Sequence, residues 1–239
     1  MTHWFFLASF FMFLFVQSCS LYTAKQGSDS SASLQTGYAK DGKISNSDLS
    51  RWNVMGGGTV TMDAAEKAVR ITESRDSKGI TLVSPRAYPG NVVLTFNVKP
   101  EQYKGVCVVF LSTSDKATGT IKIPTDNDGS LPWWSEGTVQ NYMFALHTGF
   151  HQPNIFIRKN PGSTDIAQTK DIASEQKWYT VEIGRKGPRL WLKVDGRTAV
   201  EGNDPDGRGL PGGNIGIRLR GPGDGSYSCL FRDLEIRTE

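Results

Sequence analysis

The sequence predicts an all-β fold, in which two antiparallel sheets pack face to face as a sandwich. Three observations support this prediction: short apolar runs, turn-forming residues between the runs, and weak helical periodicity throughout. Glycine, proline, asparagine and aspartate provide the separations. The ten runs are KAVRIT, GITLVS, NVVLTFNV, GVCVVFLS, NYMFALHT, NIFIRK, WYTVEIGRKG, RLWLKVDG, GNIGIRLRG and CLFRDLEIRT.

Alternation within the runs predicts which side chains face the core. Leu190, Leu192 and Val194 point to one face of a strand, and the residues between them point to the other. The Asp-Gly pair at 195–196 supplies the positive φ angles of a tight hairpin turn. We therefore expect two strands joined by a hairpin over residues 189–202.

The N-terminus predicts export. The apolar run from Trp4 to Val16 is shorter than the roughly 20 residues that span a membrane, and it suits the core of a signal peptide. The segment VQSC at its end resembles a bacterial lipobox, whose cysteine becomes the lipidated first residue. We therefore expect a signal peptide at 1–18, lipidation of Cys19, and a membrane-anchored lipoprotein in the periplasm or at the cell surface. An ordinary signal peptide followed by a stray cysteine is the alternative.

The rest of the chain predicts a tether and one folded domain. Residues 19–47 are rich in Ser, Gly, Ala, Lys and Gln, a composition typical of a flexible tether. Residues 48–239 are long enough to bury one core, and we expect a single β-sandwich domain there.

A long connection interrupts the strand rhythm at 113–138. It contains Trp133 and Trp134, and aromatic residues are scarce in disordered segments. Connections of this length are often functional. We therefore expect a structured loop beside the functional site.

Charge and cysteine content limit the partners of the domain. The formal net charge is +3, with 27 basic and 24 acidic residues mixed along the chain. This mixture argues against a nucleic-acid partner, since nucleic-acid binders concentrate their basic residues on one face, and we expect membrane contact through the lipid anchor only. Cys107 and Cys229 lie in separate apolar runs, so a disulfide and two buried thiols both fit the sequence.

The stretch at 141–162 gathers the residue types of a catalytic site. Tyr142 and His147 are candidate general bases, and Arg158 is a candidate partner for a carboxylate because its planar fork matches two oxygens. If Leu146 faces the core, His147 faces the opposite side of its strand, where a groove would lie. A histidine fixed at the rim of the sheet is the structural alternative.

Further residues are candidates for binding a sugar. Trp133 and Trp134 offer aromatic faces on which the C–H faces of a sugar ring can stack, and the remaining candidates offer polar groups for its hydroxyls. Each also has a structural interpretation, as a turn residue, a solvated edge or an exposed loop tip. The polar candidates are Glu136, Asn141, His151, Lys159 and Asn160.

The order of several motifs resembles the YesU-like family, a bacterial domain of unknown function. The resemblance spans Trp52 to Arg237 and rests on GVCVVFLS, NYMFALHTG, RKNPG, KWYTVEIGRKGPRLWLKVDGRTA, GLPGGNIGIRLRG and FRDLEIR. It implies the concanavalin A-like lectin and glucanase fold, a jelly roll whose concave face holds saccharides, and a role with complex, often acidic, polysaccharides. A more distant likeness, through VKPEQYKGVCVVFL, WYTVEI, LKVDG and GNIGIRLRG, is to the 3-keto-disaccharide hydrolase domain.

These features together predict an exported protein that cleaves or binds polysaccharide fragments. No E-x-D-x-x-E pattern occurs in the sequence, which disfavours retaining hydrolysis by two close carboxylates. A lyase site, with a base and a cation, is therefore the catalytic version of the prediction, and a non-catalytic glycan-binding module is the alternative. A purely structural module is the third class. We expect no cofactor, with structural calcium at Asp126–Gly129 or Asp204 left open.

Overall fold

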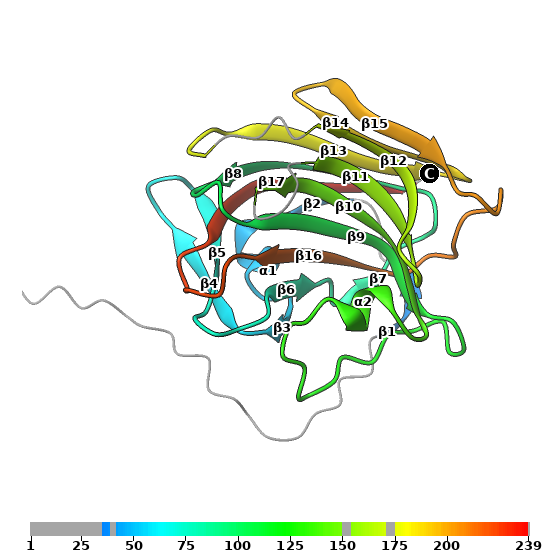
Figure 1. Ribbon diagram of the computed structural model, residues 1–239, viewed down its shortest axis with the longest axis horizontal. Coiled ribbons are helices and arrows are strands. Elements are labelled where there is room, and N and C mark those ends of the chain that lie inside the picture. The colour runs from blue at the N-terminus through cyan, green and yellow to red at the C-terminus, as the bar shows by residue number, and fades with distance from the viewer. Residues whose placement is uncertain (1–34, 39–41, 150–153, 171–174, 239) are drawn as a thin grey trace, which may run out of the picture. The chain divides into compact units, whose positions relative to one another are not determined.

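The computed structural model describes residues 35–38, 42–149, 154–170 and 175–238, of which 35–38, 147 and 148 are described by their backbone alone. Two antiparallel sheets pack face to face in this part of the chain, which confirms the predicted sandwich (Figure 1). The two sheets are named here by their number of strands.

The seven-stranded sheet has the order β12-β11-β10-β9-β16-β6-β3. Its middle strands, β9 and β10, pair antiparallel with Met143 opposite Phe110 and Ala145 opposite Val108. The strands are β3 (Asn53–Gly56), β6 (Ile80–Val83), β9 (Val106–Asp115), β10 (Val139–Thr148), β11 (Asn154–Asn160), β12 (Thr164–Lys170) and β16 (Asn214–Arg220).

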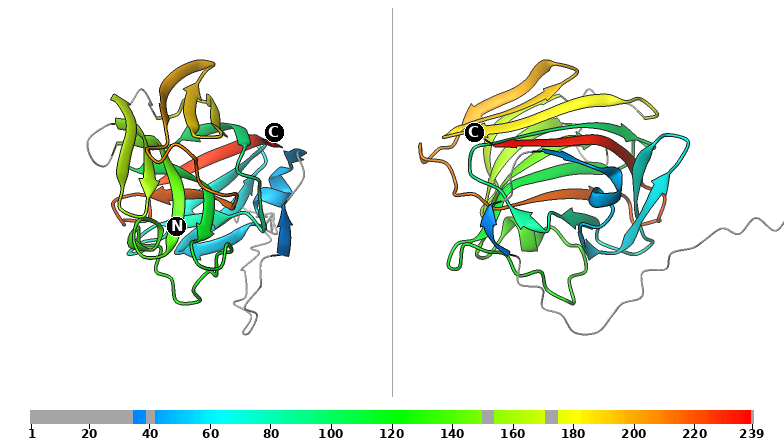
Figure 2. Two further views of the ribbon diagram at one scale, coloured as in Figure 1. Left: turned by 90° about the vertical axis from the view of Figure 1, so that its right-hand side faces the viewer. Right: turned by 180° about the vertical axis from the view of Figure 1, so that it is seen from behind.

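The eight-stranded sheet has the order β15-β14-β13-β8-β17-β5-β4, and β2 pairs with β17 outside that order. The view from behind in Figure 2 shows the short β2 beside β17. The strands are β2 (Gly42–Ile44), β4 (Gly58–Asp63), β5 (Ala68–Glu73), β8 (Val92–Pro100), β13 (Tyr179–Lys186), β14 (Arg189–Val194), β15 (Arg197–Asn203) and β17 (Ser228–Thr238).

The other elements are short. β1 (Gln35–Tyr38) and β7 (Arg86–Ala87) form a parallel pair, and the two helices, α1 (Asn46–Leu49) and α2 (Pro132–Ser135), have four residues each. Within the described residues, no helix combines the length and the apolar character needed to cross a membrane.

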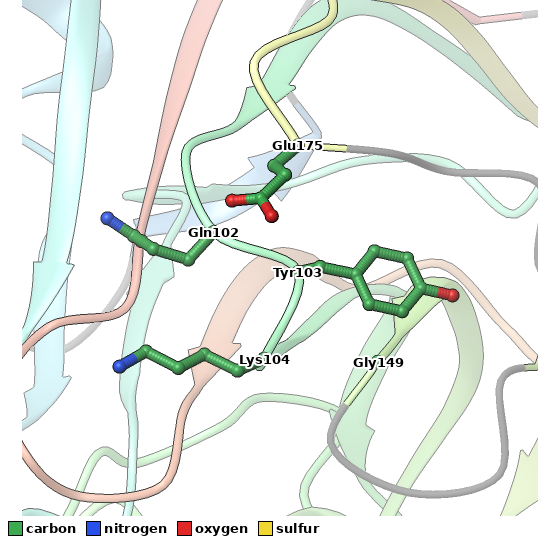
Figure 3. Close-up of a pocket in the computed structure, with 5 residues that line it drawn as sticks. All are labelled: Gln102, Tyr103, Lys104, Gly149 and Glu175. Carbon is green, nitrogen blue, oxygen red and sulfur yellow. The ribbon is translucent and has the colours of Figure 1, made fainter.

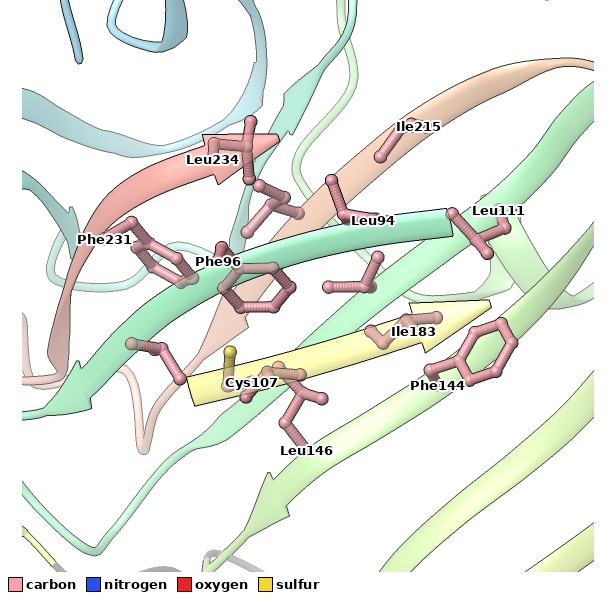
Figure 4. Close-up of a cluster of buried hydrophobic side chains, with 14 of the residues drawn as sticks. Leu94, Phe96, Cys107, Leu111, Phe144, Leu146, Ile183, Ile215, Phe231 and Leu234 are labelled. Carbon is pink, nitrogen blue, oxygen red and sulfur yellow. The ribbon is translucent and has the colours of Figure 1, made fainter. Parts of the chain in front are cut away.

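The main core fills the space between the sheets. Alternate residues of β8, such as Leu94 and Phe96, meet Ile183 of β13 and Phe144 of β10 there, and all four are buried (Figure 4). This alternation leaves every second residue of β8 on the outer face of the eight-stranded sheet. The period-2 pattern of the sequence therefore reports the packing of this sheet correctly.

A second apolar cluster covers the outer face of the seven-stranded sheet. It joins strand residues to Ile121 and Trp134, which come from the connection between β9 and β10. Both faces of β9 and β10 are consequently buried, which explains why their sequences are nearly continuous apolar runs. The connection at 113–138 is thus structured, as predicted, and it covers this face, whereas its place beside a functional site stays a prediction. The buried members of the cluster are Met55, Val83, Val108, Phe110, Ile121, Trp134, Val139, Met143, Ala145 and Phe156.

The predicted hairpin at 195–196 is present between β14 and β15. Leu190, Leu192 and Val194 belong to the main core, as their alternation predicted. Asp195 and Gly196 have φ angles of 50° and 76° and form the turn.

Two short strands lie within the segment 19–47. β1 pairs with β7, and β2 pairs with β17 through Ile44 opposite Leu234. The tether and the domain boundaries stay predictions. Of the cysteines, Cys107 and Cys229 are buried and are not joined in a disulfide, while Cys19 lies outside the described residues.

Close packing around Tyr227 gives a test of the sandwich. A Cβ atom at Gly105 would lie 2.2 Å from the Tyr227 ring, so we expect Gly105→Ala to lower the free energy of unfolding by about 1–3 kcal/mol. Urea unfolding measures this change. Gly119→Asn is the control, because Gly119 has open space around it and asparagine tolerates its φ of 73°. Equal stability of the two variants would contradict this packing.

Candidate functional site

A pocket lies at one end of the sandwich, where β8 connects to β9. Its volume is about 330 Å³, and Figure 3 shows the residues that line it. They come from three parts of the chain: the β8–β9 connection, the residue after β10, and the segment before β13. The lining residues are Gln102, Tyr103, Lys104, Gly149 and Glu175.

Hydrogen bonds hold the parts of the chain that build this pocket. The backbone N–H of Gln176 donates to the carbonyl of Pro100 at 2.7 Å, and the Gln176 side chain donates to the carbonyl of Glu101 at 2.8 Å. These bonds fix the segment of Glu175 against the β8–β9 connection. Gln102 in turn accepts from the backbone of Ser228 at 2.9 Å. The pocket is therefore attached to β17 as well as to β8.

The pocket combines an aromatic ring with groups of both charges. Figure 3 shows the side chains of Gln102 and Lys104 on one side of the connection and the Tyr103 ring on the other. Lys104 forms an exposed ion pair with Asp224, at 2.9 Å. Glu175 is exposed and supplies a carboxylate. The Tyr103 ring can stack on one face of a ligand ring, and the polar side chains can exchange hydrogen bonds with hydroxyl groups.

The sequence missed these pocket residues. The segment VKPEQYKG contributed only to a family resemblance, and Glu175 lies in a polar segment far away in the sequence. An aromatic residue between polar ones in a connection was the available signal. The pairing of that connection with residue 175 depends on the packing of the sheets.

Tyr142, a predicted base, lies in the main core. Its hydroxyl donates to a carboxylate oxygen of Asp204 and accepts from the backbone N–H of Leu210 at 2.8 Å. Burial, together with the Asp204 carboxylate, raises the pKa of Tyr142 above its ordinary value. The neutral phenol is therefore the stable form, which favours a structural role over that of a base.

Lys159 completes this buried network. Its ammonium lies 2.9 Å from Asp204 and 2.5 Å from Asp206, so it joins β11 to the segment after β15. Burial opposes ionisation of Asp204, but hydrogen bonds from Tyr142 and Lys159 outweigh it and lower the pKa of this carboxyl. All three side chains are thus occupied by one another, and the network closes one edge of the sandwich.

Asn141 and Asn160 hold α2 against the outer face of the seven-stranded sheet. Asn160 donates to Asn141 at 2.8 Å, and Asn141 donates to the carbonyl of Trp134 at 2.7 Å. Both asparagines are buried, so their amides serve the fold. Trp134 is fully buried and stacks on Phe110 with ring centroids 4.3 Å apart, while Trp133 is half-buried at its edge.

Arg158 and Lys159 point to opposite faces, as their adjacent positions on a strand predicted. Arg158 pairs with Met143 in register and lies over the ring of Phe156 at 4.2 Å on the outer face. It also forms an ion pair with Asp165, at 2.5 Å. Its guanidinium is one-third exposed, so it remains accessible to a ligand on this face.

The remaining predicted residues are spread over the molecule. The backbone of His147 pairs with Cys107 in β10, and its side chain lies outside the described residues, as do His151 and Cys19. Glu136 is exposed after α2. Because a strand rises about 3.3 Å per residue, positions 141 and 147 are about 20 Å apart. The strand therefore separates His147 from the Trp133–Trp134 end, and the convergence of His147, Arg158 and an indole is not seen in the backbone.

Two expectations about ligands stay predictions. Among the residues that the structure describes, no group of three or more His, Cys, Asp and Glu side chains could hold a metal ion. Two of the aspartates considered for calcium are bonded to protein groups, Asp128 to Lys78 at 2.8 Å and Asp204 to Lys159.

Comparison with solved structures identifies the type of sandwich. The chain is similar to a Bacillus subtilis protein of unknown function with a galectin-like fold, with a TM-score of 0.74, 17% identity, and coverage of 84% of this chain and 97% of that one. It is also similar to the Bacillus licheniformis β-glucanase, with a TM-score of 0.57, 15% identity, and coverage of 86% and 100%. The fold is a jelly roll of the lectin and glucanase type.

A carbohydrate-binding module, CBM66 from Bacillus subtilis, shares this fold, with a TM-score of 0.52, 14% identity, and coverage of 77% of this chain and 97% of that one. At such identities the likeness shows the fold alone. No protein-family model matches the chain, and no curated protein sequence matches it. The predicted lectin and glucanase fold is thus confirmed, whereas the YesU-like and 3-keto-disaccharide hydrolase resemblances stay predictions.

The Tyr142 network gives a test of its structural role. Tyr142→Phe keeps the ring but removes the hydroxyl, which leaves the Leu210 N–H without its acceptor and Asp204 without one of its donors. We expect the free energy of unfolding to fall by about 1–3 kcal/mol, measured by urea unfolding. Thr180→Val, which removes an exposed hydroxyl bonded to Asn97, is the control and should change stability by less than about 0.5 kcal/mol. An unchanged stability of Tyr142→Phe would contradict the structural assignment.

Proposed function

We propose that this protein is a carbohydrate-binding domain whose glycan site is the pocket at Tyr103. The pocket residues carry the proposal, because the β8–β9 connection presents the Tyr103 ring on one side and an amide and an ammonium group on the other, with the Glu175 carboxylate close to the connection. A sugar ring has apolar C–H faces and a rim of hydroxyls. It therefore needs a ring to stack on and both donors and acceptors around it.

The size of the pocket suits a small part of a glycan. Small-molecule sites have volumes of about 300–1,000 Å³, and the pocket lies at the lower end of this range. A site of this size takes a chain end or a single branch, and the rest of the glycan would extend into solvent. The end of the sandwich is open enough for this arrangement, since Lys104 and Glu175 are exposed.

Related structures support a carbohydrate ligand. Beside the carbohydrate-binding module and the β-glucanase, similar structures include the Emp46p carbohydrate recognition domain and a lumenal domain of VIP36 bound to Man3GlcNAc. Their recurrence makes a glycan the first ligand class to test. We propose the YesU-like family as the relationship that underlies this likeness, on the strength of the motif order between Trp52 and Arg237.

The pocket favours binding without cleavage. Of its described lining residues, Glu175 alone is a carboxylate, whereas glycoside hydrolysis commonly uses two. The lyase version of the proposal required Tyr142 or His147 as a base beside Arg158. Tyr142 is held as a neutral donor in the core, and Arg158 lies on the other face of its sheet. A complex polysaccharide fragment, acidic or neutral, is thus proposed as a ligand that the protein holds intact.

The export of the chain also remains a proposal. The apolar run at Trp4 to Val16 and Cys19 at its end support a lipoprotein anchored outside the cytoplasm. In that location the folded domain would meet extracellular or periplasmic glycans.

Substitution of Tyr103 tests the glycan site. We expect Tyr103→Ala to weaken oligosaccharide binding at least tenfold because it removes the stacking face, whereas Tyr103→Phe keeps the ring and most of the affinity. Isothermal titration calorimetry with neutral and uronic-acid oligosaccharides measures the dissociation constants. Absorbance of unsaturated products in the same mixtures reports lyase activity, which we expect to be absent. Wild-type affinity in Tyr103→Ala would move the site elsewhere.

Substitution of the lipobox cysteine tests the anchor. Cys19→Ser in the full chain removes the thiol to which a lipid is attached, so the protein should no longer be labelled by radioactive palmitate and should leave the membrane fraction. Cys229→Ser is the control, because this thiol is buried in the folded domain and cannot be acylated. Equal labelling of Cys19→Ser and the wild type would exclude the anchor.

A further inference from the structure

Arg218 of β16 is a buried cation on the outer face of the seven-stranded sheet. Its side chain is 5% exposed. One terminal nitrogen donates to the carbonyl of Lys78 at 2.8 Å, and the other, Nη1, has no hydrogen-bond partner. Buried polar groups are nearly always paired, so this nitrogen is exceptional.

A second unpaired polar group lies on the residue opposite. Thr81 of β6 is the register partner of Arg218, so the two side chains lie next to each other on the same face of the sheet. Thr81 is fully buried, and its hydroxyl also has no hydrogen-bond partner. Two neighbouring donors without acceptors therefore lie on adjacent strands.

Two carboxylates near Arg218 form ion pairs with other cations. Glu73 pairs with Arg220, and Asp128 pairs with Lys78. Among the residues that the structure describes, no carboxylate forms an ion pair with Arg218. Glu73 and Asp128 favour the charge of Arg218 electrostatically, but each is paired directly with another cation, so the buried guanidinium has no carboxylate in direct contact among these groups.

This arrangement is costly for the protein alone. Burial and the nearby charge of Arg220 lower the pKa of Arg218 to about 10, so the guanidinium still carries its charge at neutral pH. A buried charge with no directly paired counterion is costly to the folded state, and an anion in contact with it would reduce this cost. A hydrogen bond from a charged guanidinium nitrogen to a carboxylate oxygen is stronger than one between neutral groups.

The backbone beside Arg218 is shaped around the guanidinium. A Cβ atom at Gly79 would lie 1.9 Å from Nη1, so only glycine leaves this nitrogen its space. The turn at 126–130 lies over the same region, since Lys78 donates to the carbonyl of Asp128 at 3.2 Å. The Lys78–Asp128 ion pair is exposed, so an incoming anion can compete for it from solvent.

We propose that Arg218 and Thr81 form a binding position for a carboxylate, covered by the turn at 126–130 and separate from the Tyr103 pocket. The bound carboxylate accepts from Arg218 Nη1 and from the Thr81 hydroxyl. It belongs either to an acidic sugar or to a free small carboxylate. The position does not depend on the glycan site, because none of its residues line that pocket.

Titration with carboxylates tests this position. Glucuronate and acetate are added to the full-length protein, with glucose as the uncharged counterpart of glucuronate, and calorimetry gives the dissociation constants. We expect the wild type to bind a carboxylate but not to respond to glucose at the Arg218 position. Arg218→Lys should weaken carboxylate binding about tenfold, because one ammonium group cannot hold the Lys78 carbonyl and donate to the carboxylate in the fixed geometry of the two guanidinium nitrogens. Tighter binding of glucuronate than of acetate identifies an acidic sugar, and equal binding identifies a free carboxylate.

Matched variants separate carboxylate binding at Arg218 and Thr81 from binding elsewhere on the protein. Thr81→Val keeps the shape of the side chain and should weaken carboxylate binding severalfold, which also provides the test if Arg218→Lys does not fold. Arg189→Lys, at an exposed arginine paired with Glu201, should bind carboxylate as the wild type does. The proposal is overturned if the wild type binds no carboxylate, or if Thr81→Val and any folded Arg218→Lys protein keep wild-type affinity.

Discussion

The structure depends on the burial of both faces of its seven-stranded sheet. On the inner face, Tyr142 and Phe144 pack against the other sheet, and on the outer face Trp134 stacks on Phe110. The cover of the outer face is a connection with almost no regular structure. It stays in place because its apolar side chains are buried and because buried amides bind the backbone of α2. The middle of this face is consequently closed by the chain itself.

This closure determines where a ligand can bind. The connection at 113–138 is held on the sheet by the buried side chains of Trp134, Asn141 and Asn160. These residues resemble a sugar site in the sequence, but they stabilise the fold. The Tyr103 pocket lies at one end of the sandwich, where Lys104 and Glu175 are exposed, whereas Arg218 and Thr81 are buried. The glycan site proposed at the Tyr103 pocket lies outside the closed middle of the sheet.

The two sheets differ in how they meet solvent. The outer face of the eight-stranded sheet carries paired charges, such as Lys99 with Glu66 at 2.5 Å and Lys193 with Glu182 at 2.9 Å. Ion pairs of this kind add little stability each, but they keep a broad sheet face wetted and discourage association. Against this background of paired charges, the Nη1 atom of Arg218 is unusual, because it is buried and has no hydrogen-bond partner.

The sequence by itself determined the sandwich and much of its core. Alternation at Leu190, Leu192 and Val194 reports a local property, the direction of successive side chains on a strand, and therefore needs no knowledge of distant residues. The opposite directions of Arg158 and Lys159 follow for the same reason. The Asp-Gly turn at 195–196 is likewise a matter of local backbone conformation.

Only the tertiary structure decided which polar residues are free to bind. Tyr142 is held by Asp204, and Glu175 reaches the β8–β9 connection; both depend on segments far apart in the chain. Composition cannot reveal whether an asparagine or tryptophan meets solvent or another strand, since the side chain suits both. The partner of a polar group is a long-range contact, and sheet packing, not local sequence, sets it.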